Sequence, residues 1–166
     1  MSIVVGYSPS GQGRAALKAA LRYGARTGEE LVIASHLYHD AERGMTAATE
    51  DEVRDELREV GAEQADVTVR SSLENDIGEF ILSVVDEVAA SLVVIGLRRK
   101  PPIGKLNLGA SARRVVLGAA CPVLAVKDDH RTGGVGGVTG SWAGGNKPPQ
   151  AALYSTGLTA PCVRAP

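Results

Sequence analysis

The sequence lacks the features that mark membrane and secreted proteins. No apolar stretch reaches the length of about 18 residues that a transmembrane helix needs, and no basic segment precedes an apolar one at the N-terminus. We therefore expect neither a membrane span nor a cleaved signal peptide. The only two cysteines, Cys121 and Cys162, are far apart and form no CxxC pair, a pattern that predicts free thiols in the reducing cytoplasm.

The chain also lacks a strong net charge. Its 18 basic and 19 acidic residues give a net charge of −1, whereas nucleic-acid-binding domains are typically basic, so no nucleic-acid partner is expected. The charges are unevenly distributed. Residues 88–127 contain seven Lys or Arg and no acid, while residues 1–87 contain eight basic and seventeen acidic residues. One basic region on an acidic body is typical of a local anion site.

The composition changes after Lys127. Residues 128–166 hold eight of the 20 glycines and four of the 8 prolines, and no helical or strand periodicity continues through them. We therefore predict one folded domain over residues 1–127 and a Gly/Pro-rich, disordered tail over residues 128–166.

Apolar periodicity in the first 127 residues predicts alternating strands and helices. The predicted strands are Ser2–Gly6, Leu31–Tyr38, Asp66–Arg70, Leu92–Ile95 and Pro122–Val126. The predicted helices are Arg14–Arg26, capped by Ser10, then Thr49 to about Val60, Ile77–Val88 and Gly109–Leu117. Five strands separated by four helices predict an α/β fold, an open parallel sheet with helices on both faces. If the strand order is 3-2-1-4-5, the loops after the first and fourth strands flank a ligand crevice.

A basic loop containing glycines, Gly96–Ser111, follows the fourth predicted strand. A strand, a glycine loop and a helix N-terminus in this order favour phosphate binding. The cluster Arg98–Lys100 has two interpretations, phosphate contact or a solvated surface loop. A P-loop would need GxxxxGK[ST], but Arg99 and Leu106 occupy the first glycine and the hydroxyl positions, so a P-loop NTPase is not expected.

Three other motifs are weak. Gly11–Ala16 fits GxGxx[GA], but its first glycine comes five residues after the first strand, so glycine flexibility at the helix start explains it better. His36, His39 and Asp40 match no zinc-ligand spacing, and no metal site is predicted. Neither a GxSxG elbow nor a Cys–His pair is present, so no catalytic residue is predicted.

Three segments of residues 1–127 together resemble the universal stress protein family. They are Ile3–Gly6 followed by Ala15–Leu17, then Leu92–Gly96, and finally Cys121–Lys127. The loop between Gly96 and Gly109 is similar to that of actinobacterial members. The resemblance implies an adenine nucleotide alpha-hydrolase-like sheet of order 3-2-1-4-5, a regulatory role under stress in the cytoplasm, and a homodimer formed through the last strand, Val123, Leu124, Ala125 and Val126.

The resemblance also implies a nucleotide site with departures from the family pattern. ATP-binding members carry Gly, two residues, Gly, nine residues, then Gly followed by Ser or Thr. Gly96 and Gly109 match the first and third glycines, but Arg99 replaces the second and Ala110 occupies the hydroxyl position, with Ser111 next. Ser8 aligns with an acidic residue of the family, and its substitution removes an acceptor for the nucleoside.

Two hypotheses follow from the resemblance. In the first, the domain binds ATP, with or without Mg²⁺, or a related adenine nucleotide. The expected contacts come from Ser8, Leu37, Ile95, Gly96, Arg99, Gly109, Ala110 and Ser111. In the second, the site is degenerate and the protein is a nucleotide-free dimeric interaction module. An enzyme is the third and weakest alternative, with at most slow ATP hydrolysis.

Overall fold

The structure is a computed structural model that describes residues 1–98 and 108–128. Its centre is a five-stranded parallel sheet in the order β5-β2-β1-β6-β7. These strands are β1 Ser2–Tyr7, β2 Glu30–Ser35, β5 Val67–Ser71, β6 Leu92–Leu97 and β7 Val123–Lys127. When only these five strands are numbered in chain order, the strand order is 3-2-1-4-5. The predicted fold class and strand order are therefore confirmed.

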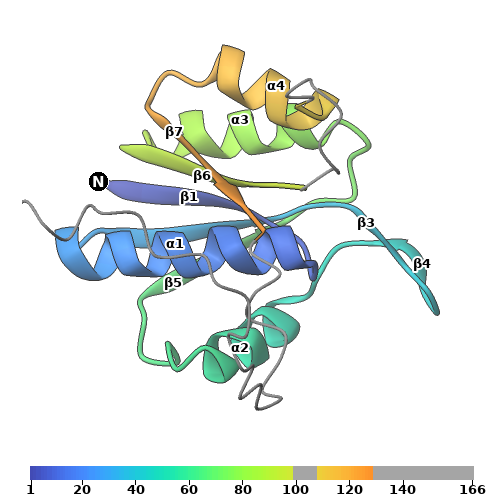
Figure 1. Cartoon of the computed structure of the whole chain (residues 1–166), viewed down its shortest axis with the longest axis horizontal. Helices are drawn as coiled ribbons and strands as arrows, with labels where there is room; N and C mark the ends of the chain where they lie inside the picture. Colours follow the sequence, from blue (N-terminus) through green and yellow to red (C-terminus); the bar gives the residue numbers. More distant parts are fainter. Residues whose placement is uncertain (99–107, 129–166) are drawn as a thin grey trace, which may run out of the picture. The chain divides into compact units, whose positions relative to one another are not determined.

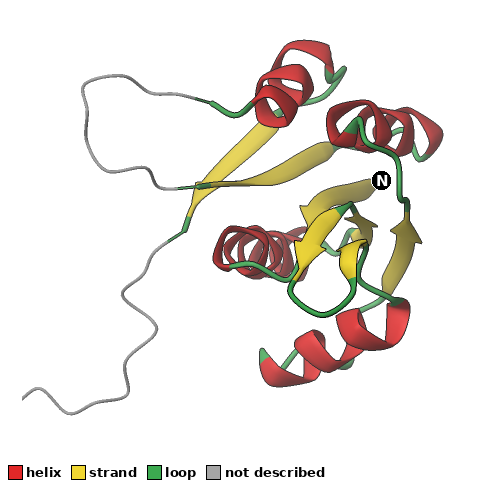
Figure 2. Cartoon of the chain, turned by 90° about the vertical axis from the view of Figure 1, so that its right-hand side faces the viewer, coloured by secondary structure: helices red, strands yellow, loops and turns green. Residues whose placement is uncertain are grey.

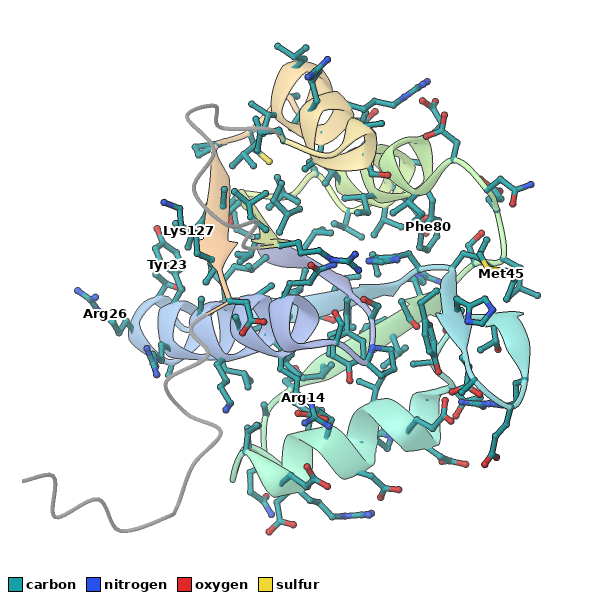
Figure 3. All side chains as sticks on the ribbon, turned by 45° about the vertical axis from the view of Figure 1, so that its right-hand side comes forward. Arg14, Tyr23, Arg26, Met45, Phe80 and Lys127 are labelled. Atoms are coloured by element: carbon teal, nitrogen blue, oxygen red, sulfur yellow. The ribbon has the colours of Figure 1, made fainter. Side chains whose placement is uncertain are left out.

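Four helices cover the two faces of the sheet (Figures 1 and 2). They are α1 Gly11–Thr27, α2 Glu50–Glu59, α3 Ile77–Glu87 and α4 Ala110–Gly118. Side chains of α1 and α2 pack on one face, and those of α3 and α4 pack on the other. Phe80 of α3, for example, lies between its helix and the sheet (Figure 3). Within the described part of the chain, no helix is both long enough and apolar enough to cross a membrane.

The central strands are buried on both faces, which explains their nearly continuous apolar sequences. Ile3, Val4 and Val5 of β1 are fully buried, as are Val93 and Val94 of β6. Alternate residues serve opposite clusters: Val4 packs with α3, whereas Val5 packs with α1.

Charged residues join the two helices on the α1 face. Arg14 extends from α1 toward α2 (Figure 3), and its Nε lies 3.0 Å from Oε2 of Glu56. Glu56 is 7% exposed, whereas half of the Arg14 side chain reaches solvent. The ion pair therefore compensates a carboxylate that would otherwise be costly to bury.

One prediction of secondary structure was wrong. The second strand was expected to run through Tyr38, but β2 ends at Ser35, and Tyr38 instead begins an antiparallel hairpin of β3 Tyr38–Asp40 and β4 Gly44–Thr46. The Asp40 carboxylate accepts hydrogen bonds from the N–H groups of Glu42 and Arg43, and Gly44 adopts a φ of 72°. This Asx-type turn lies in a polar segment without strand periodicity, and the sequence pattern therefore did not reveal the hairpin.

Candidate functional site

Three neighbouring strands end side by side at the carboxyl edge of the sheet. Tyr7 of β1 is the register partner of Ser35 of β2. The pairing of Val5 with Val94 puts Gly96 of β6 level with Tyr7 when the two strands are followed onward. In parallel α/β sheets ligands bind at this edge, at the point where successive connections leave on opposite faces. Here that point lies between β1, which leads to α1, and β6, which precedes α4 on the opposite face.

The N-terminus of α4 differs from those of the other three helices. Ser10, Thr49 and Asp76 cap α1, α2 and α3, each accepting a hydrogen bond from a backbone N–H of the first turn. The α4 cap position is Gly109, and no side chain of the described residues caps this helix. Its first-turn N–H groups thus have no side-chain acceptor among the described residues, and the helix dipole favours an anion there.

The geometry at Gly109 leaves room for such an acceptor. Gly109 has φ −58° and ψ 159°, values open to any residue, and a Cβ atom added to it would meet nothing within 4 Å. Glycine is therefore not required here by the backbone or by the described neighbours. Its effect is that no described side chain covers the α4 N-terminus.

The two predicted residues after Gly109 lie on different sides of α4. Ala110 is exposed, whereas Ser111 is half-buried and lies one turn before Val115, which is fully buried against the sheet. Residues four apart share a helix face, so Ser111 lies on the sheet side. Ser111 therefore carries a hydroxyl on the sheet side of α4, next to the position where Ala110 has none.

The start of α1 lies directly against the end of β6. A Cβ atom on Gly96 would overlap with the backbone carbonyl of Gln12, so β6 and α1 are in direct contact here. Gly11, at the start of α1, packs against the Asp128 carboxylate at the end of β7. Because Ser10 and Asp128 already place oxygen atoms beside this N-terminus, an anion is favoured at α4 rather than at α1.

The structure assigns unequal roles to the remaining predicted residues. The Ser8 side chain is buried, and its Oγ lies 3.1 Å from Oγ of Ser10. Ile95 buries its side chain in the core against α3, so only its backbone faces the edge. Leu37 is buried just after β2. The predicted contact from Arg99 lies outside the described residues.

Sequence reasoning did not include His36 among the site residues. His36 follows β2, and its N–H donates to the Tyr7 carbonyl at 3.0 Å, which extends the pairing of β1 and β2 by one residue. Its Nδ1 lies 3.1 Å from the Leu37 carbonyl oxygen. Burial lowers the pKa of His36 from its usual value, partly opposed by the hydrogen bond to Leu37, so the imidazole is neutral at pH 7. The sequence did offer one signal for His36, because its imidazole directly precedes Leu37, a predicted site residue.

The residues of the other sequence motifs do not form a common site in the structure. His39 is exposed in β3, and the Asp40 carboxylate is engaged in the hairpin turn. Among residues 1–98 and 108–128, no group of three His, Cys, Asp or Glu side chains could hold a metal ion. Gly11 and Gly13 belong to the first turn of α1, and a Cβ atom on Gly13 would overlap with the Ser8 carbonyl. Close packing therefore explains Gly13.

The basic residues near α4 have two kinds of environment. Arg114 pairs with Asp76 at 2.9 Å and with Glu79 at 2.6 Å, which ties α4 to the N-terminus of α3 and raises the Arg114 pKa. Arg98 and Arg113 are exposed and form no ion pair with the described residues. These two side chains can supply positive charge to an anion near the α4 N-terminus.

Comparison with known proteins gives a consistent family match. Residues 1–127 match the model of the Universal stress protein family. A universal stress protein from Mycolicibacterium smegmatis is 35% identical over 125 residues, which are 75% of this chain and 96% of that protein.

Solved structures share the fold at lower identity. A universal stress protein from Archaeoglobus fulgidus matches with a TM-score of 0.58 and 24% identity, covering 76% of this chain and 98% of that one. A universal stress protein in complex with cAMP gives 0.55 and 22%, covering 78% and 98%. A universal stress protein from Archaeoglobus fulgidus in complex with dAMP gives 0.53 and 20%, covering 76% and 98%. At these identities the likeness establishes the fold.

Proposed function

The chain belongs to the universal stress protein family, and we propose that it binds ATP or a related adenine nucleotide at the carboxyl edge of its sheet. One observation carries the proposal. The N-terminus of α4 has no side-chain cap among the described residues, while the other three helices are capped. This terminus begins at Gly109, which resembles the last glycine of the nucleotide-binding loop of the family.

The phosphates bind at the first turn of α4 in this proposal. The backbone N–H groups of Ser111 and Ala112 and the Ser111 hydroxyl donate to phosphate oxygens. The Ser111 hydroxyl thus takes over the role that Ala110 cannot perform. Arg98 and Arg113 contribute charge, and Arg99 is proposed as a further cation. Mg²⁺, when present, would be held by the phosphate oxygens of ATP, and we propose no protein ligands for it.

The nucleoside lies across the ends of β1 and β6 and reaches β2. Gly96 lets the end of β6 lie directly against the first turn of α1. In this proposal, Leu37 and the Ile95 backbone contact the base. Ser8 is the weakest of the proposed contacts, because its hydroxyl is buried beside Ser10. The complexes of related folds with cAMP and dAMP support an adenine nucleotide as the ligand class.

We also propose that the protein acts as a cytoplasmic homodimer in a stress response. β7 is an edge strand that pairs with β6 on one side and with no other strand of the described sheet. Leu124 in this strand is 38% exposed. An apolar edge strand is an aggregation hazard unless it is covered, and pairing with the same strand of a second copy would cover it.

A nucleotide-free interaction module is the second candidate function, and Ser8 favours it. Where the family carries an acid, this chain has a buried hydroxyl that already has a neighbour within hydrogen-bond distance. If the site is degenerate in this way, the dimer surface would remain the functional element.

Native mass spectrometry of the purified full chain separates the two candidates. Nucleotide binding predicts a mass increment of one adenine nucleotide per protomer after brief incubation with ATP·Mg²⁺, and its loss in Gly109→Asp. An unmodified protomer mass at millimolar ATP would contradict the nucleotide proposal and leave the interaction module.

A further inference from the structure

His36 lies on the same face of the sheet as the proposed phosphate site. Ala34, two residues earlier in β2, packs with α3, while Ser35 points to the other face and donates to the Ala48 carbonyl at 2.8 Å. The hydrogen bond from His36 N–H to Tyr7 continues the strand alternation. The His36 side chain therefore belongs to the face that α3 and α4 cover.

One nitrogen of the imidazole is committed and the other is available. The Leu37 carbonyl can only accept, so Nδ1 must carry the proton of that hydrogen bond. In a neutral ring, Nε2 is then an acceptor. Nε2 has no hydrogen-bond partner among the described residues. Toward the described residues, Nε2 is therefore available as an acceptor.

The position of His36 suits a nucleoside better than a phosphate. β2 lies two strands from β6, a distance of about 10 Å at the usual spacing between strands. A nucleotide with its phosphates on α4 must therefore extend its nucleoside toward β1 and β2. The neutral imidazole is also a poor partner for a phosphate. Its available nitrogen, Nε2, is an acceptor, whereas phosphate oxygens need a donor, which Nε2 becomes only in a protonated ring.

From this arrangement we propose that His36 determines nucleoside specificity, with Nε2 accepting a hydrogen bond from a donor on the ligand. The donor is the 6-amino group of adenine or the ribose 2′-hydroxyl. The assignment rests on the proposed nucleotide site and adds a residue to it. It also gives the nucleoside an acceptor just after β2, where Ser8 provides no carboxylate.

Calorimetric titration of the full chain with AMP, IMP and dAMP tests the assignment. IMP lacks the 6-amino group and dAMP lacks the ribose 2′-hydroxyl. We expect the wild-type chain to bind AMP about threefold to tenfold more tightly than one of these analogues, which identifies the donor. His36→Phe should weaken AMP binding by a similar factor. The variant should then bind AMP and that analogue with equal affinity.

Two further variants separate recognition from structure. His36→Gln places an amide oxygen near the position of Nε2, and it should keep the preference for AMP. His39→Phe changes an exposed histidine of the hairpin and should leave all affinities unchanged. If His36→Phe keeps the wild-type ratio of affinities for AMP and the analogues, the role of His36 is overturned, but the proposed nucleotide site is not. Absence of binding by the wild-type chain would instead contradict the proposed function, and with it this assignment.

Discussion

Gly96 lies against the carbonyl oxygen of Gln12 so closely that a Cβ atom at this position would overlap with it. This contact joins the end of β6 to the first turn of α1 and fixes the base of the proposed site. Gly109, by contrast, has no described neighbour within 4 Å of its Cβ position. The two glycines that match the family spacing therefore have different surroundings.

Gly96→Ala should destabilise the fold, because the obstacle is backbone and cannot rotate away. We expect the free energy of unfolding to fall by about 1–3 kcal/mol, the usual cost of overpacking. Urea denaturation followed by circular dichroism measures this change. Gly109→Ala is the matched control and should lose less stability, because its Cβ atom meets no described neighbour and only the preference for glycine over alanine at a cap position is lost. Equal stability of the two variants would show that the contact with Gln12 is not restrictive.

Gly109→Asp should change stability and binding in opposite directions. An aspartate at the cap position accepts from the free N–H groups of α4 and should raise the free energy of unfolding by a few tenths to about 1 kcal/mol. The same carboxylate occupies and repels the phosphate position, so ATP affinity should fall by about tenfold or more.

Gly109→Asn separates charge from capping in that experiment. Its amide caps the helix without a negative charge, and it should keep more affinity than Gly109→Asp at comparable stability. Thermal unfolding and calorimetry on both variants provide the comparison. If the aspartate variant binds ATP as tightly as the wild type, the phosphates are not at α4.

Protonation of His36 should make the fold less stable in mild acid. Its pKa is lowered in the folded state, so the unfolded chain binds a proton first as the pH falls below the usual value of 6.5. The stability contribution is complete above that pH and is lost as the pH falls through the lowered pKa. Urea midpoints between pH 7 and pH 5 should therefore fall more in the wild type than in His36→Gln. Parallel midpoints would contradict a buried neutral imidazole.

Leu124→Lys should convert the proposed dimer to a monomer. Leu124 is 38% exposed on the edge strand, so the charge disturbs the protomer little but opposes pairing of two such edges. Light scattering coupled to size exclusion should report about half the wild-type mass. Leu73→Lys, at an exposed loop leucine, is the control and should remain a dimer. A monomeric wild type would rule out a stable dimer.

The fold could be predicted from the sequence because local and global signals agree. The apolar runs of β1 and β6 require burial on both faces, and Ser10 and Thr49 mark helix starts that the structure retains. The hairpin at Tyr38–Thr46 was missed because an Asx-type turn at Asp40 determines it, and three-residue strands carry too little periodicity to be detected.

The candidate site was less predictable, because spacing identifies positions but not directions. Gly96 and Gly109 were found by their separation, yet the sequence did not distinguish the packing of the first from the openness of the second. Ser111 gains importance over Ala110 only through its place on the sheet side of α4. The sequence drew attention to His36 only as a metal ligand. Its tautomer could not be predicted, because it depends on the hydrogen bond to the Leu37 carbonyl.

Calorimetric titration of the full-length chain with ATP·Mg²⁺ tests the central claim most directly. The proposed site predicts saturable heat with about one nucleotide per protomer, and competition by AMP. Absence of heat at millimolar ATP, from protein shown to be folded by circular dichroism, would contradict it.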